Sequence, residues 1–206
     1  TDRAKDKAGE PSLAEMTTKA IDILSQNKNG YFLMVEGGRI DHAHHLGNAF
    51  RALRDTVALS DAVRAASQKV NLDDTLIIVT ADHSHTLTIA GYPARGNNIL
   101  GLVHQVDDDG NVEAAPKLDR DKKPYTTLGY ANGPGNKGNP DRPVLTQEQV
   151  TNPDYLQSSG VPLIDETHGG EDVAIFATGV NAYLIRGSME ENWIFYVMAD
   201  ALRLRP

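Results

Sequence analysis

The chain has 206 residues, 40% of them hydrophobic, which is enough to bury the core of one globular domain. Its formal net charge of −8 and the absence of any Lys/Arg run argue against a nucleic-acid-binding surface, which needs a clustered basic face. The absence of cysteine excludes disulfides, thiolate metal ligands and a cysteine nucleophile.

The chain begins with a polar segment and continues into a predicted helix. TDRAKDKAGE has neither an initiating methionine nor an apolar signal core, so we expect a mature, trimmed or partial product. No apolar run approaches the roughly 20 residues that span a bilayer. Ser12 and Glu15 form the sequence pattern of a capping box, which predicts a helix to about Asn27. The apolar run Tyr31 to Val35 predicts the first strand.

Strands and helices alternate through most of the remaining chain. Leu46 to Val70 has the pattern of a long amphipathic helix, and the run Leu76 to Val79 predicts a strand directly after it. A further strand is expected at Val173 to Phe176. Ser188 with Glu191 predicts a capping box at the start of a closing helix that ends near Leu204. A strand–helix–strand order predicts parallel pairing.

Residues 92–163 interrupt this alternation. Gly, Pro, Asn and Asp dominate there, and we interpret the stretch as an irregular subdomain inserted over the site or at a subunit contact. For residues 133–143, disorder and order remain equally open. The predicted organisation is therefore a first core segment at 1–91, the insertion at 92–163, and a final strand and helix at 164–206.

Three polar clusters lie at the ends of predicted strands, where open α/β sheets carry their ligands. They are EGGRIDHAHH (36–45), TADHSH (80–85) and ETHGGED (166–172). Each cluster alone would be an ordinary capped turn or surface pair. Together they favour one bimetallic site, because ionisable groups at three strand ends are costly to bury unless they are paired or liganded.

The residue types and spacings suggest which ions are held. Asp41 and His45 lie one helical turn apart and, with His168, make a three-ligand set typical of a catalytic zinc. Asp82 and His83 suggest a second zinc ion. Glu36 offers an oxygen ligand that suits magnesium. The other four histidines are assigned last. We interpret His42 and His85 as hydrogen-bond partners of ligands or bound water, and His44 and His104 as structural.

The motifs VEGGRIDHAHH, TADHSH, GYPARGNNILG and ETHGGEDVAIFA resemble the C-terminal half of alkaline phosphatases, nearer the animal and marine-bacterial type than the type with Lys at the position of His42. The resemblance covers the chain from about Pro11 to Leu202. It implies a phosphomonoesterase with two zinc ions and one magnesium ion that works at alkaline pH through a phosphoserine intermediate. It supports the same assignment of Asp41, His45 and His168, of Asp82 and His83, and of Glu36.

The resemblance also implies a fold and an assembly. Expected are a three-layer α/β/α fold with a mostly parallel sheet, of which this chain supplies only part, and a crown-like insertion at a homodimer contact. The nucleophilic serine and the phosphate-binding arginine of the family belong to its N-terminal half, and nothing here matches them. We therefore expect this chain alone to be inactive, its substrates to be phosphate monoesters, and its location to be periplasmic or secreted.

Two residues and two other functions offer alternatives to this interpretation. Ser84 lacks the context of the family's serine, and Arg39 is better interpreted as a structural residue that binds nearby carboxylates. The alternatives are another metal-dependent hydrolase of the same superfamily, such as a phosphodiesterase or phosphomutase, and a non-catalytic metal-binding module.

Overall fold

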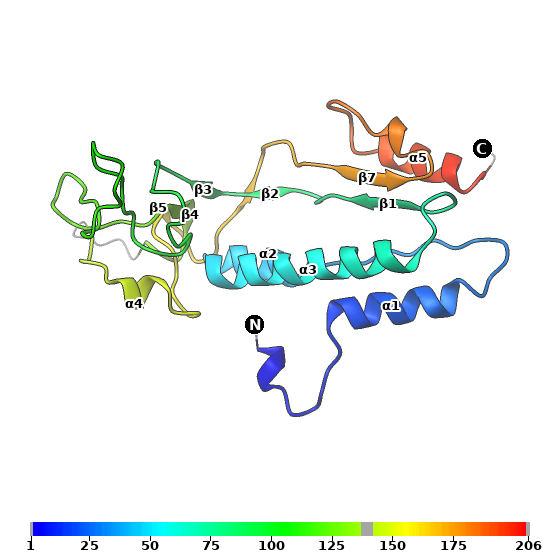
Figure 1. Ribbon diagram of the computed structural model, residues 1–206, viewed down its shortest axis with the longest axis horizontal. Helices are drawn as coiled ribbons and strands as arrows, with labels where there is room; N and C mark the ends of the chain where they lie inside the picture. Colours follow the sequence, from blue (N-terminus) through cyan, green and yellow to red (C-terminus); the bar gives the residue numbers. More distant parts are fainter. Residues whose placement is uncertain (1, 137–141, 205–206) are drawn as a thin grey trace. The chain divides into compact units, whose positions relative to one another are not determined.

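The computed structural model describes residues 2–136 and 142–204, and the chain divides into two compact units. The first unit comprises residues 1–37, 56–84 and 171–206, and the second comprises residues 38–55 and 85–170. The elements appear in Figure 1 in this order: η1 Arg3–Lys5, α1 Leu13–Leu24, α2 Arg39–His45, α3 Ala49–Lys69, β1 Leu76–Val79, β2 Ser84–His85, β3 Leu87–Ile89, β4 Leu128–Gly133, α4 Gln147–Val150, β5 Ser159–Pro162, β6 His168–Gly169, β7 Phe176–Gly179, η2 Ala182–Leu184 and α5 Trp193–Ala201.

The first long helices form as the sequence predicts. At the start of α1 the Ser12 side chain accepts a hydrogen bond from the Glu15 backbone N–H, and the Glu15 carboxylate accepts one from the Ser12 N–H at 2.7 Å. This confirms the capping box. The predicted amphipathic helix is confirmed as α3. An ion pair of 2.7 Å between Lys69 and Asp22 joins the end of α3 to α1.

Strands β1 and β7 form a two-stranded sheet in the first unit (Figure 1), and they pair antiparallel, with Leu76 opposite Gly179. The strand predicted at Val173 to Phe176 lies three residues later in the structure, where β7 begins at Phe176 and ends at Gly179. Gly179 is required at its position, because it has a φ of +95° and a Cβ there would lie 1.9 Å from the Thr75 carbonyl oxygen. The expectation of a parallel partner for Leu76 to Val79 is wrong for this pair.

The predicted strand Tyr31 to Val35 is also wrong. The segment has no regular secondary structure, and Phe32 and Met34 are 58% and 69% exposed. A strand exists only where a neighbour satisfies its N–H and C=O groups, and among the described residues no strand pairs with this segment. The apolar run is correctly located in the sequence but lacks the partner that would make it a strand.

The closing helix is confirmed, but its predicted capping box is wrong. Helix α5 begins at Trp193, and its N-cap Asn192 makes no side-chain capping hydrogen bond. The turn before it is closed by the backbone instead, where the Trp193 N–H donates to the Glu190 carbonyl at 3.0 Å. The Ser188 hydroxyl therefore lies too early in the chain to cap the first turn.

The second unit holds a three-stranded sheet in the order β3-β4-β5, with β4 antiparallel to β3 and parallel to β5. In the same unit, Leu102, Leu145 and Val150 form a small core with Tyr155 packed against it. Most of the predicted insertion is thus ordered around short elements. Of the stretch for which order and disorder were open, residues 133–136 and 142–143 belong to the described structure and residues 137–141 lie outside it.

The turn from α2 to α3 is fixed by buried polar contacts. The Asn48 side chain accepts from the Arg51 backbone N–H at 3.0 Å, which caps α3, and donates to the Pro153 carbonyl at 2.8 Å. Gly47, with a φ of +65°, accepts the Gln157 backbone N–H at 2.8 Å. These contacts fix the exit of α2 within its unit. In the described ranges, no helix combines the length and the apolar character needed to cross a membrane.

Candidate metal centre

Helix α2 brings the first two candidate ligands together. Asp41 and His45 lie four residues apart, so their side chains project from one face of the helix. The Asp41 Oδ1 atom lies 3.2 Å from the His45 Nε2 atom. The structure places both residues in one helix, which supplies the geometry that the four-residue spacing suggests.

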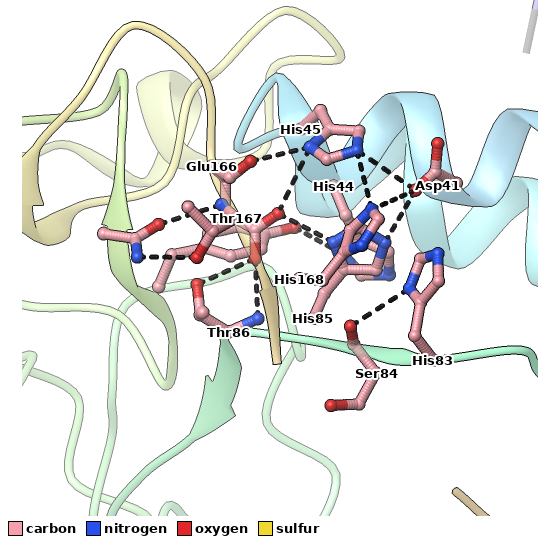
Figure 2. A network of polar contacts seen from close by, with 12 residues as sticks. Asp41, His44, His45, His83, Ser84, His85, Thr86, Glu166, Thr167 and His168 are labelled. Atoms are coloured by element: carbon pink, nitrogen blue, oxygen red, sulfur yellow. Dashed lines mark hydrogen bonds and ion pairs between the residues drawn. The ribbon is translucent and has the colours of Figure 1, made fainter. Parts of the chain in front are cut away.

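His168, from β6, reaches the same point, as Figure 2 shows. Its Nε2 atom lies 3.2 Å from the His45 Nε2 atom and 3.5 Å from the Asp41 Oδ1 atom. Zinc bonds of about 2.0–2.1 Å at tetrahedral angles separate neighbouring ligand atoms by about 3.3–3.4 Å. The three atoms already have the spacing of one face of a zinc tetrahedron, and the donor set of one carboxylate and two imidazoles fits that ion.

His85 lies against this triad and is almost buried, with 8% of its side chain exposed. Its Nε2 atom is 3.1 Å from the Asp41 Oδ1 atom, and its Nδ1 atom is 2.7 Å from the Glu166 Oε2 atom. The ring also stacks on His44, with ring centroids 4.6 Å apart. His85 therefore lies between two carboxylates, and its predicted role as a partner of a ligand carboxylate remains a prediction.

His44 is held by Tyr130, whose hydroxyl lies 2.8 Å from the His44 Nδ1 atom. Burial is the main reason that the pKa of His44 falls to about 4, and the neighbouring His85 lowers the pKa further. Burial also raises the pKa of Tyr130. Both groups are neutral near pH 7, so they support the ring of His85 without adding charge beside the candidate ligands.

Glu166 is the most deeply buried of these residues, with 0% of its side chain exposed. Its Oε1 atom accepts from the Thr86 backbone N–H at 2.6 Å and from the Thr86 hydroxyl at 2.8 Å (Figure 2). Its backbone carbonyl accepts from the His45 Nδ1 atom at 2.6 Å. The roles of Glu166 and Tyr130 were missed by sequence reasoning. For Glu166 a signal existed, since it is a carboxylate two residues before a candidate ligand.

The remaining predicted ligands belong to the first unit. Asp82 and His83 are neighbours in sequence, and the Asp82 Oδ2 atom lies 3.5 Å from the His83 Nε2 atom. The segment between β1 and β2 therefore places these two ligand atoms near each other. Glu36 is exposed. The assignments of Glu36, Asp82 and His83 to ions remain predictions.

Two further residues from the sequence analysis have different surroundings. His42 is exposed on α2, with its Nδ1 atom 3.4 Å from the Arg39 guanidinium, so its predicted role remains a prediction. In the first unit, the Ser84 hydroxyl donates to the Glu171 carboxylate at 2.7 Å, and this hydrogen bond lowers the pKa of Glu171. The Ser84 hydroxyl is engaged by a carboxylate that is itself exposed.

Known proteins resemble this chain over most of its length. The family model described as alkaline phosphatase matches residues 1–204. The tissue-nonspecific isozyme of alkaline phosphatase is 48% identical in Felis catus and 46% identical in Homo sapiens, over 93% of this chain and 35% of each of those proteins. The alkaline phosphatase of Gadus morhua is 44% identical over 97% of this chain and 40% of its own length.

A solved structure is similar in fold. The cold-active alkaline phosphatase from the psychrophile Shewanella sp. has a TM-score of 0.56 and 23% identity, over 92% of this chain and 50% of that one. The chain belongs to the alkaline phosphatase family. It spans 35% to 40% of the length of the curated relatives named above.

Proposed function

We propose that this chain is part of a metal-dependent phosphomonoesterase, in which Asp41, His45 and His168 hold a first zinc ion. The observation that carries the proposal is the set of three distances, 3.2, 3.2 and 3.5 Å, between their ligand atoms. Membership of the alkaline phosphatase family supports it from a different direction.

The other ions of the proposal use residues of the first unit. Asp82 and His83 would hold a second zinc ion, supported by the 3.5 Å separation of their ligand atoms. Glu36 would be a ligand of one magnesium ion, to which its hard carboxylate oxygen is suited. His42 and His85 would make hydrogen bonds to ligand groups or bound water.

The chain's own residues bind and orient in this proposal. The carbonyl of Glu166 accepts the Nδ1 proton of His45, which leaves the lone pair of Nε2 directed at the site. Ions held there would supply Lewis-acid chemistry, which neutralises charge on the phosphate and on the leaving oxygen. Because the transition state of phosphoryl transfer is loose, positioning and charge neutralisation are most of what the protein contributes.

The nucleophile in this proposal is a serine outside the 206 residues, which would form a phosphoserine intermediate at alkaline pH. The phosphate-binding arginine would also lie outside. Two observations support this: the chain spans only 35% to 40% of its relatives, and the Ser84 hydroxyl is engaged with Glu171. The chain by itself would then be inactive.

The same proposal extends to the whole protein. Strands from outside these residues would join segments 1–91 and 164–206 in a three-layer α/β/α fold with a mostly parallel sheet. Residues 92–163 would form a crown-like region at a homodimer contact. We propose a periplasmic or secreted location. Each of these rests on the family and on the composition of the chain.

The test compares two substrates in the protein that contains this chain. An aryl phosphate monoester should be hydrolysed in strong preference to the matching diester. A chelator should abolish the hydrolysis, and zinc with magnesium should restore it. Preference for the diester would point to a phosphodiesterase, and no turnover of either substrate in the metal-loaded protein would point to a non-catalytic metal-binding module.

A further inference from the structure

We propose that Glu166 is a positioning residue that fixes the geometry of the candidate zinc site through both its side chain and its backbone. This inference rests on the proposed function, because it assumes that Asp41, His45 and His168 hold zinc. Every contact that carries it lies within the second unit.

The first step is the cost of burying the Glu166 carboxylate. A buried charge is expensive unless several hydrogen bonds compensate it, and an apolar side chain of similar size would avoid that cost. Three donors surround this carboxylate: the Thr86 backbone N–H, the Thr86 hydroxyl and the His85 Nδ1 atom. Gly133 leaves room for it, because a Cβ there would lie 3.1 Å from the Glu166 Cβ. The surroundings of the Glu166 side chain therefore suit a carboxylate.

The second step is the orientation of His85. A carboxylate only accepts hydrogen bonds, so the contact at 2.7 Å requires the His85 Nδ1 atom to carry a proton. The opposite ring atom, Nε2, then faces the Asp41 Oδ1 atom at 3.1 Å. Stacking on His44 fixes the plane of the ring. Glu166 thereby fixes the position of the ring whose Nε2 atom lies against Asp41.

The third step is the backbone of Glu166. Its N–H donates to the His45 carbonyl at 2.8 Å, and its carbonyl accepts from the His45 Nδ1 atom at 2.6 Å. The same segment delivers His168 two residues later (Figure 2). One buried residue therefore acts on all three candidate ligands: on Asp41 through His85, on His45 through the backbone, and on His168 through the chain.

The test is Glu166→Gln in the protein that contains this chain. The two Thr86 donors would hold the amide oxygen, so the amide NH2 would face His85 Nδ1 and oppose the native tautomer. Loss of such a partner typically weakens metal binding by about 10- to 100-fold. We expect a loss of that size in zinc affinity, measured by chelator competition, together with a changed visible spectrum of the cobalt(II)-loaded protein. Thr86→Val should act in the same direction with a smaller effect.

The matched control is Val150→Ala, which removes buried volume from a core cluster of the same unit that contains no histidine. It should lower stability but leave the zinc affinity and the cobalt spectrum unchanged. A merely structural role for Glu166 predicts that Glu166→Gln behaves like this control. That result, with zinc binding lost in His168→Ala, would overturn the inference while the zinc site stands.

Nitrogen NMR of histidine-labelled wild-type protein keeps the inference testable if Glu166→Gln does not fold. His85 should carry its proton on Nδ1, and an unprotonated Nδ1 would overturn the inference. Failure of the proposed function has a different signature. The wild type would then bind no zinc, or would bind zinc without hydrolysing a phosphate monoester.

Discussion

Replacing His168 with alanine tests the candidate zinc site most directly. The His168 Nε2 atom is one corner of a triangle of ligand atoms with sides of 3.2, 3.2 and 3.5 Å. Removing it leaves two protein ligands, Asp41 and His45. A catalytic zinc ion normally has three, so the variant should hold zinc weakly.

The expected loss of zinc affinity can be estimated from the loss caused by removing a residue that only orients a ligand. Loss of a residue that only orients a ligand already costs up to about 100-fold in affinity. Loss of the ligand itself should cost at least that much, which is about 2.8 kcal/mol of binding free energy. The zinc dissociation constant, measured by chelator competition, gives this number directly, and hydrolysis of a phosphate monoester should fall in parallel.

His104→Ala is the matched control, since it removes the same side chain from the same unit. The His104 Nδ1 atom donates to the Glu113 carbonyl at 2.9 Å, within the predicted insertion. Zinc affinity in this variant should be that of the wild type. Equal zinc dissociation constants for His168→Ala and His104→Ala would remove His168 from the site and refute the reasoning from the ligand triangle.

Three other predictions concern the nucleophile, the core and the acid stability of the chain. The isolated 206-residue chain should release no phosphate from a monoester above background with zinc and magnesium present; steady metal-dependent release that Ser84→Ala abolishes would contradict this. Val150→Ala should lower the free energy of unfolding in urea by about 2 kcal/mol, because it removes two buried methyl groups and leaves a cavity; a loss near zero would show that the core closes around the smaller side chain. Hydrogen bonds from the Lys123 backbone N–H and from Arg142 hold the pKa of Asp119 below its usual value of 3.8. That lowered pKa stabilises the fold above pH 3.8, and the contribution is lost as the pH falls through the folded value. The stability difference between the wild type and Asp119→Asn should therefore be constant from pH 7 to 5 and shrink as the pH falls below 4, and a difference that stays undiminished from pH 5 down to pH 2 would contradict the assignment.

The helices were predictable because their signals are local. The capping box of Ser12 and Glu15 lies within four residues, and the apolar stripe of α3 repeats along a single segment. Strands depend on a partner that the sequence does not reveal. The run Tyr31 to Val35 has the composition of a strand but no described partner, and the direction of β7 against β1 has no signature in either segment.

The sequence indicates the candidate ligands of the site, but it does not indicate the residues that position those ligands. Asp41 and His45 have a spacing with direct geometric meaning, and His168 follows from chemistry, since zinc needs a third ligand. The supporting contacts join residues far apart in the chain. Tyr130 is 86 residues from His44. The amino-acid sequence also does not show whether a given glutamate is buried, as Glu166 is.

The separation of the ligands in the chain has an energetic consequence. His45 and His168 are 123 residues apart, so an unfolded chain does not hold them together. Zinc should therefore bind the folded second unit and not the unfolded one, and binding should stabilise the fold. At a free zinc concentration of 100 times the dissociation constant, this linkage contributes about 2.7 kcal/mol to the free energy of unfolding. His168→Ala should forfeit that contribution while leaving the stability of the zinc-free protein nearly unchanged, because the ring is half exposed and its nearest polar neighbours are other candidate ligands. Denaturation with and without zinc would then separate what the side chain does for the metal from what it does for the fold.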